Sequence, residues 1–223
     1  MARINKAFTI VELLTVMSII ILLMGLLVPA LQTVRRYSLI TRQHSQFHDI
    51  EIGLELYKTD FGDYPDTFKI GRTTNVESGA EILAKALIGP NALGPYYVDI
   101  DTIGAVKINQ IYDVNKFPDS NATGGTYVLT DVFDRASFDG RKHGMPILYW
   151  KAHNKLFLTD IYRREENGLF FTVDQPYVDG GEIFYDAIKD KNCPLDRPKR
   201  DDYILLSAGP DGFYFTGDDI YNF

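Results

Sequence analysis

The chain has 223 residues, 45% of them hydrophobic, so it can bury one sizeable core. Its formal net charge is −7, and after residue 31 it carries 21 basic and 29 acidic residues. A surface this acidic repels nucleic acid and is suited to divalent cations. Cys193 is the only cysteine, which excludes an intrachain disulfide and leaves packing or a bound metal to stabilise the fold.

The first predicted element is an apolar helix long enough to cross a membrane. Residues 8–31 have the sequence FTIVELLTVMSIIILLMGLLVPAL, with Glu12 as the single charge. At about 1.5 Å per residue, this run exceeds the roughly 30 Å hydrocarbon core of a bilayer. It is longer than the apolar part of a secretory signal and no small-residue cleavage site follows it, so we expect it to be retained as a single-pass anchor.

Glu12 is the unusual residue of this helix, because a lone carboxylate in hydrocarbon costs on the order of 2.5 kcal/mol and needs a partner. A cut between Ala7 and Phe8 would create an amine four residues before Glu12, which a neighbouring copy could offer to the carboxylate. The run Lys6-Ala7-Phe8-Thr9-Ile10-Val11-Glu12, leading into the apolar stretch, resembles the class III (prepilin) signal of type IV pilins and type II secretion pseudopilins.

This resemblance implies that residues 1–7 are a leader, that prepilin peptidase cuts between Ala7 and Phe8 on the cytoplasmic side, and that Phe8 is then N-methylated. Ala7 stands where the family usually has glycine. Glu12 is implied to act in assembly, and so is Pro29, at a position where the family commonly has a proline linked to unwinding of the helix. The alternatives are a plain signal anchor with an incidental Glu12, and a Pro29 that only marks the membrane exit.

An amphipathic pattern predicts that the helix continues beyond the membrane. The apolar residues of one face recur every three or four positions, at Val34, Tyr37, Phe47, Ile50, Leu54, Tyr57 and Phe61. Residues 8–31 are thus the membrane and assembly half, and residues 32–62 are the amphipathic half that packs on a head. A helix of roughly 80 Å would be too long for a compact domain. Residues 57–65 also resemble the Tyr-x-x-Asp-x-Gly-x-Tyr-Pro signature of major pseudopilins.

Residues 63–223 are predicted to form a globular α+β head, and the resemblance implies a pilin-like fold with a small antiparallel sheet. A short helix is expected over Ser78–Ile88. Short β-type runs are expected at 126–130, 147–150, 169–173, 183–185 and 203–207. Residues 151–198 have no counterpart in the resemblance, and we expect them to be an insertion of surface loops or added strands.

Residues 206–220 predict a calcium loop. Calcium takes six to eight oxygen ligands from carboxylates and backbone carbonyls, and this segment combines three aspartates with three glycines that permit positive φ. Its place near the C-terminal end resembles the calcium loop of major pseudopilins. That resemblance implies Asp211, Asp218 and Asp219 as side-chain ligands and Ala208 as a carbonyl donor. A solvated turn held by aspartate capping is the alternative.

The sequence gives little support for a catalytic function. His44 and His48 are four residues apart on the long helix, as in some zinc sites, but no third ligand lies nearby, and a solvated helix face is expected. No serine or cysteine has a recognisable nucleophile context. We therefore expect that the chain is not an enzyme, although a pair of carboxylates for hydrolysis stays open in so acidic a domain.

The resemblance, which is closest to the major pseudopilin, implies a structural subunit of a type II secretion pseudopilus, a helical filament that helps export proteins across the outer membrane. The alternatives are a type IV pilin or minor pseudopilin, and a signal-anchored extracytoplasmic binding or hydrolytic domain. The implied partners are further copies of the chain, minor pseudopilins, prepilin peptidase and an inner-membrane assembly platform, with lipid around the helix before assembly and no nucleic acid. The implied location is the inner membrane, with the N-terminus cytoplasmic and the head in the periplasm.

Overall fold

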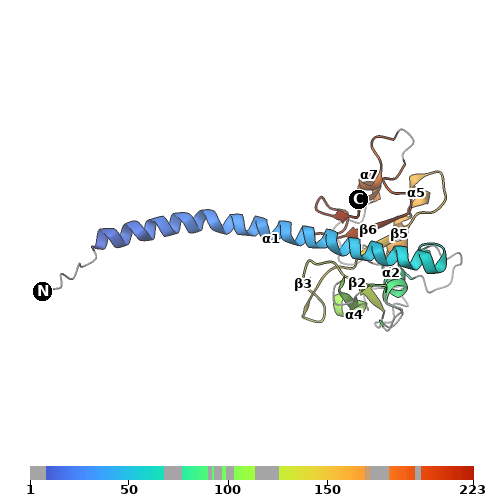
Figure 1. Cartoon of the computed structure of the whole chain (residues 1–223), viewed down its shortest axis with the longest axis horizontal. Coiled ribbons are helices and arrows are strands. Elements are labelled where there is room, and N and C mark those ends of the chain that lie inside the picture. Colours follow the sequence, from blue (N-terminus) through green and yellow to red (C-terminus); the bar gives the residue numbers. More distant parts are fainter. Residues whose placement is uncertain are drawn as a thin grey trace. The chain divides into compact units, whose positions relative to one another are not determined.

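A computed structural model of the chain describes residues 9–67, 77–89, 92, 97–98, 103–113, 126–168, 170, 181–193 and 197–223. The fold is α+β, with a long N-terminal helix and small antiparallel sheets. The chain divides into two units, Met1–Leu39 and Ile40–Phe223. Helix α1, Ile10–Phe61, runs through both of them (Figure 1).

In the first unit, the described residues are the start and the apolar stretch of α1. Its length and composition would allow it to cross a membrane, and none of that stretch is buried within the chain. Pro29 lies inside α1 without ending it. Proline has no N–H to donate to the carbonyl one turn earlier. One turn after it, the hydroxyl of Thr33 donates to the Pro29 carbonyl at 3.1 Å. The prediction of an apolar helix of membrane-spanning length is confirmed.

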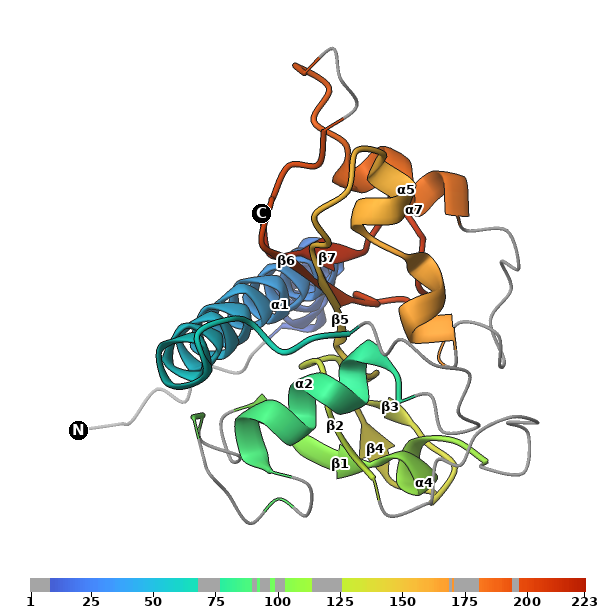
Figure 2. The same ribbon diagram turned by 90° about the vertical axis from the view of Figure 1, so that its right-hand side faces the viewer.

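The second unit contains the remaining helices and all the described strands (Figure 2). The helices are α2 (Gly79–Ile88), α4 (Ile108–Ile111), α5 (Leu158–Ile161), the 3-10 helix η2 (Arg164–Asn167) and α7 (Gly181–Ile188). The strands are β1 (Ala105–Lys107), β2 (Tyr127–Leu129), β3 (Arg135–Ala136), β4 (Lys142–His143), β5 (Leu148–Lys151), β6 (Tyr203–Ser207) and β7 (Ile220–Tyr221). They form the antiparallel pairs β1-β2 and β3-β4 and the antiparallel sheet β5-β6-β7.

Strand β6 lies at the centre of the β5-β6-β7 sheet, and all five of its residues are buried. Side chains alternate between the two faces of a strand. On one face, Tyr149 of β5 lies opposite Leu205 of β6. On the other face, Trp150 lies opposite Ile204. Two separate hydrophobic clusters cover these faces, so the sheet is buried on both sides.

The first cluster packs the second half of α1 against the sheet. Phe47, Ile50 and Leu54 of α1 are buried there, as predicted, together with Leu83 and Leu87 of α2. Helix α2 begins where the sequence predicts, because Ser78 and Glu81 form a reciprocal capping box.

The predicted apolar face of α1 is wrong at its ends. Phe61 is exposed, and Val34 and Tyr37 in the first unit are exposed as well. Two glutamines are buried instead. Gln46 Nε2 donates to the Ile103 carbonyl at 2.5 Å and the Thr130 carbonyl at 2.8 Å, and Gln43 Oε1 accepts from Val132 N at 3.0 Å. These amides fasten α1 to the backbone of neighbouring segments, which an apolar periodicity cannot reveal.

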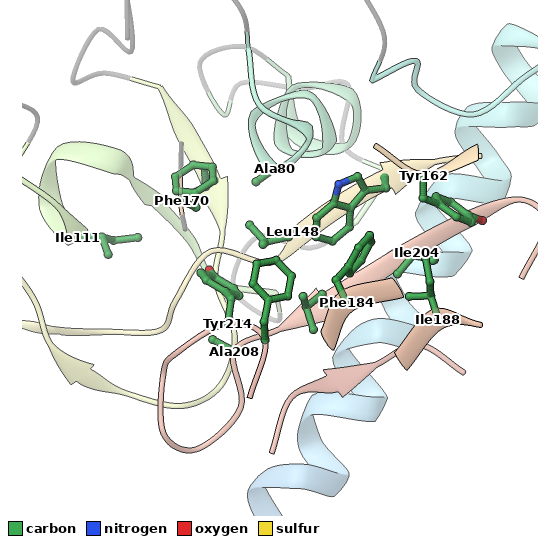
Figure 3. Close-up of a cluster of buried hydrophobic side chains, with 14 of the residues drawn as sticks. Ala80, Ile111, Leu148, Tyr162, Phe170, Phe184, Ile188, Ile204, Ala208 and Tyr214 are labelled. Carbon is green, nitrogen blue, oxygen red and sulfur yellow. The ribbon is translucent and has the colours of Figure 1, made fainter. Parts of the chain in front are cut away.

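The second cluster covers the other face of the sheet and is drawn in Figure 3. Phe184 and Ile188 of α7 pack there against Trp150 and Ile204 of the sheet, together with the buried side chain of Tyr162. The prediction that residues 151–198 form surface loops or added strands is therefore wrong, because short helices from this segment supply one wall of the core.

The strand predicted at 183–185 is also wrong. Those residues belong to α7, in which Phe184 and Ile188 occur four residues apart on one helical face. The predicted strands at 126–130, 147–150 and 203–207 are confirmed as β2, β5 and β6. The one predicted at 169–173 lies outside the described residues, apart from the buried Phe170.

Candidate functional site

The start of α1 holds the first candidate site, and Glu12 caps the helix there. The Glu12 Oε2 atom accepts from Thr9 N at 2.9 Å and from the Thr9 hydroxyl at 2.8 Å. In return, Thr9 Oγ1 accepts from Glu12 N at 3.2 Å. This is a capping box, which satisfies backbone donors that the first turn of a helix leaves unpaired. Ala7 and Phe8, the predicted cleavage positions, lie outside the described residues.

Sequence reasoning missed this capping box, although Thr-x-x-Glu before an apolar run is its signature. The box gives Glu12 a local role that needs no second copy. Both bonds to the carboxylate use Oε2, and no hydrogen bond from a described residue reaches Oε1. One carboxylate oxygen thus serves the helix start, and the other can accept a further donor.

The second candidate site is the hairpin loop between β6 and β7. Ser207 pairs with Ile220, so residues 208–219 form the loop, which begins with the buried Ala208. The chain turns sharply at Gly209, whose φ is 63°. A Cβ there would collide with the Asp218 carbonyl, so only glycine allows the two sides of the loop to come this close.

Hydrogen bonds to the predicted calcium ligands hold the loop together. Asp218 Oδ2 accepts from Asp211 N at 3.0 Å, and Asp218 Oδ1 accepts from the Thr216 hydroxyl at 2.7 Å. Asp219 Oδ2 accepts from Phe215 N at 2.8 Å and Thr216 N at 3.2 Å. These bonds are the aspartate capping that we expect if the segment is a solvated turn and not a calcium loop.

One carboxylate oxygen of Asp219 takes no part in this capping. Its Oδ1 atom is buried and has no hydrogen-bond partner among the described residues. The pKa of Asp219 is raised to about 8, chiefly by burial and in part by the nearby carboxylates of Asp211 and Asp218, although its two backbone hydrogen bonds act to lower it. An orphaned buried carboxylate oxygen near two other acids suits a cation, so Asp219 could offer this one oxygen to the predicted calcium.

The three carboxylates do not converge on one point. Among the described residues, no three His, Cys, Asp or Glu side chains are placed to hold a metal ion together. Arg135, which sequence reasoning missed, already brings a positive charge to the loop. Its Nη2 atom donates to the Gly209 carbonyl, and its guanidinium lies against Gly212.

A buried acid, Asp131, lies at the base of the same loop. Asp131 Oδ2 accepts from the Ser207 hydroxyl at 2.9 Å, and Oδ1 accepts from Phe133 N at 3.1 Å and Met145 N at 3.0 Å. Burial raises the pKa of Asp131 to about 7, although these hydrogen bonds and Arg135 act to lower it. The carboxyl joins three segments that are distant in sequence.

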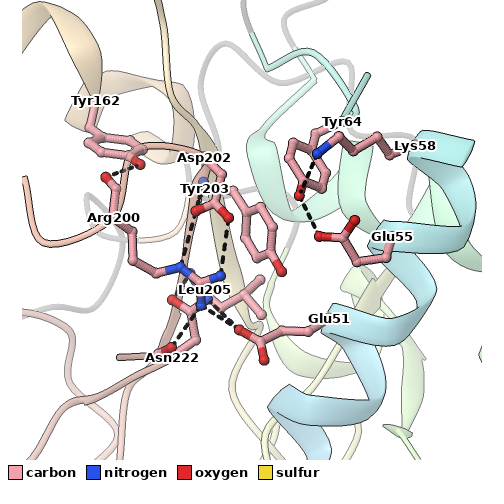
Figure 4. A network of polar contacts seen from close by, with 10 residues as sticks. All are labelled: Glu51, Glu55, Lys58, Tyr64, Tyr162, Arg200, Asp202, Tyr203, Leu205 and Asn222. Carbon is pink, nitrogen blue, oxygen red and sulfur yellow. Dashed lines mark hydrogen bonds and ion pairs between the residues drawn. The ribbon is translucent and has the colours of Figure 1, made fainter. Parts of the chain in front are cut away.

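Arg200 is the centre of a second polar network, which Figure 4 draws in full. Its guanidinium lies 2.6 Å from Glu51 Oε1 of α1 and donates two 3.1 Å bonds to the Asp202 carboxylate. It also donates to the Asn222 carbonyl at 3.0 Å. Nothing in the local sequence distinguishes Arg200 from the other basic residues, so this clasp between α1 and the C-terminal strands was not foreseen.

The histidines do not form the zinc site that was considered. His44 and His48 both lie exposed on α1. His143 Nε2 is 3.0 Å from Asp139, and His153 Nε2 is 2.7 Å from Glu166, so each of these histidines contacts a carboxylate.

Comparison of the chain with known proteins identifies no relative. No protein-family model, curated protein or solved structure matches the chain.

Proposed function

We propose that the chain is a structural subunit of a type II secretion pseudopilus, which polymerises through its N-terminal helix into a helical filament. The observation that carries the proposal is α1, a 52-residue helix whose membrane-length apolar stretch, up to Leu31, has a single charged side chain, Glu12. An apolar helix surface of this size has to be covered by lipid or by other helices. Lipid covers it before assembly, and the helices of neighbouring copies cover it in the filament.

Cleavage by prepilin peptidase between Ala7 and Phe8 would free the amine that a neighbouring Glu12 receives. The other partners are minor pseudopilins and an inner-membrane assembly platform, and the head faces the periplasm. A minor pseudopilin or type IV pilin is the second candidate. It is favoured by residues 151–198, which have no counterpart in the major pseudopilin resemblance and yet supply part of the core.

The capping box favours a different reading, a signal-anchored domain in which Glu12 only begins a helix. Two variants separate the roles of this carboxylate. Glu12→Gln removes the charge but keeps an oxygen for Thr9, because glutamine also closes a capping box. Thr9→Ala removes the box and keeps the charge. We expect both variants to insert in the membrane, Thr9→Ala to form filaments, and Glu12→Gln to form none.

Electron microscopy of filaments sheared from overproducing cells measures the outcome. Normal filaments from Glu12→Gln would show that the charge is incidental. Mass determination of the membrane-extracted protein tests processing independently. It should show loss of residues 1–7 and a methyl group on Phe8, whereas an intact N-terminus would rule out the pilin reading.

We also propose that calcium binds the β6–β7 loop, held by Asp219, Asp211 and Asp218 with the Ala208 carbonyl. When bound, the ion would neutralise the cluster of acids and stabilise the loop. Binding at a hundredfold excess over Kd adds about 2.7 kcal/mol, or roughly 5–10 °C in Tm for a domain of this size. EDTA should therefore lower the Tm of the full chain in detergent by this amount, and calcium should restore it.

The variants Asp219→Asn and Asp201→Asn give a matched pair for that experiment. Asp201 is exposed and lies outside the loop, so Asp201→Asn should keep the calcium-dependent shift, whereas Asp219→Asn should lose it. If EDTA does not change the melting curve of the wild type, the calcium proposal is wrong. The role of these aspartates is then to cap the loop.

A further inference from the structure

Two large apolar side chains are exposed in the loop before α5. Leu156 is 87% exposed and Phe157 is 71% exposed, the highest values for any large apolar side chain described in the second unit. Neighbouring exposed apolar residues on a folded domain are typical of an interaction site. We call Leu156 and Phe157 the apolar knob.

The apolar knob is held in a fixed conformation by bonds on both sides. After it, the Phe157 carbonyl accepts from Ile161 N at 2.9 Å, within the first turn of α5. Before it, His153 N donates to the Ile161 carbonyl at 2.9 Å, and Lys155 N donates to the His153 carbonyl at 2.8 Å. The hydrogen-bond contact between His153 Nε2 and Glu166 Oε1, at 2.7 Å, ties the loop to η2. Binding through a loop that is already ordered costs less conformational entropy.

A groove of about 390 Å³ lies along α1 in the same unit. We call it the α1 groove. Ile52 and Leu56 contribute its apolar surface and are 47% and 48% exposed, so no described part of the chain covers them fully. Its charged lining residues are Glu51, Glu55 and Arg200, whose formal charges sum to −1.

We propose that the apolar knob of one copy inserts into the α1 groove of a second copy. The apolar surfaces match, and so do the charges. Lys155, directly before the knob, is exposed and forms no ion pair with a described residue, so it can face the acidic side of the groove. A lipid surface is a poorer occupant, because anionic headgroups repel a domain that is net negative.

The inference rests on the proposed function, because a filament supplies the neighbouring copies. It adds a contact between heads to the contact between N-terminal helices. The segment that bears the knob belongs to residues 151–198, so this contact would be particular to chains that carry such a segment.

Disulfide cross-linking between two full-length copies tests the contact. Both copies carry Cys193→Ser and different tags, one has Phe157→Cys and the other has Leu56→Cys. They are expressed together and their membranes are oxidised with copper phenanthroline. A disulfide requires Cα atoms within about 7 Å, so a seated knob should give far more mixed dimer than chance encounters between copies. We expect a strong mixed dimer, and several-fold less of it when Lys155→Glu is added.

Phe138→Cys is the matched control for Phe157→Cys. Phe138 is an equally large side chain, 62% exposed in another part of the same unit. Paired with Leu56→Cys, it should give about tenfold less mixed dimer, equivalent to 1.4 kcal/mol. Equal yields from the two pairs, or cross-linking of Phe157→Cys only to other proteins, would overturn the contact.

The cross-linking experiment, combined with the filament and processing measurements above, separates the two proposals. If filaments form but the cross-link does not exceed its control, the knob contact is wrong and the proposed function stands. If the N-terminus is intact and no filaments form, the proposed function is wrong, and the cross-link in detergent-extracted full chain still measures whether two heads associate in this way.

Discussion

Replacing Phe184 by alanine tests whether residues 151–198 belong to the core. The Phe184 side chain is fully buried, and its ring lies 4.8 Å from that of Trp150 and 5.7 Å from that of Phe215. An aromatic side chain buries roughly 150–250 Å², which at about 25 cal/mol per Å² corresponds to about 4–6 kcal/mol. Alanine retains part of this, and Phe→Ala changes in cores cost about 3–5 kcal/mol. We therefore expect Phe184→Ala to lower the free energy of unfolding by about 4 kcal/mol.

Trp150 provides the signal for this measurement, because it is the only tryptophan and lies against Phe184. Urea unfolding of the full chain in detergent, followed by tryptophan fluorescence, gives the free energy of unfolding for each variant. Phe138→Ala is the control, and it should change stability by no more than about 0.5 kcal/mol because that side chain is exposed. A loss below about 1 kcal/mol for Phe184→Ala, with unchanged native fluorescence, would refute the packing of α7 on the sheet.

Two further predictions concern buried polar groups. The folded pKa of Asp131, about 7, lies above the unfolded value of about 3.9, so its protonation favours the folded state below pH 4, and this contribution disappears as the pH rises through 7. The stability of the wild type relative to Asp131→Asn should thus fall by about 2–3 kcal/mol between pH 5 and pH 8, and a difference independent of pH would contradict the burial of this carboxyl. Arg200→Met removes the guanidinium between Glu51 and Asp202, and because these groups are partly exposed we expect a loss of about 2 kcal/mol in urea unfolding at low salt. Lys191→Ala, at an exposed position, should cost less than about 0.5 kcal/mol, and an equal loss from both variants would exclude a specific role for Arg200.

Elements marked by a local signal could be predicted from the sequence. The apolar run after Phe8 gives α1 its first half, Ser78 and Gly89 bound α2, and the β-branched and aromatic residues of 203–207 form β6. The loop acids could be named because they lie close together in sequence.

What could not be predicted depends on contacts between distant residues. The run at 183–185 has the composition of a strand, but it lies within α7, where Phe184 packs against the distant Trp150. Arg135 reaches the loop of Asp219 from another part of the sequence, and Gln46 is polar but buried because two distant carbonyls accept its amide hydrogens. Thr9 and Glu12 are different, since their capping box had a local signature that was overlooked.

The central position of β6 has a consequence for the order in which the domain can fold. Among the described strands, β5 pairs only with β6, which begins 52 residues after β5 ends. Both hydrophobic clusters include residues of β6, so neither can close before Tyr203–Ser207 has been synthesised. Until then the edge of β5 and the apolar faces of α1, α2 and α7 stay open to other chains. The head should therefore depend on assistance during synthesis, and truncations that remove β6 should yield aggregates rather than a smaller folded domain.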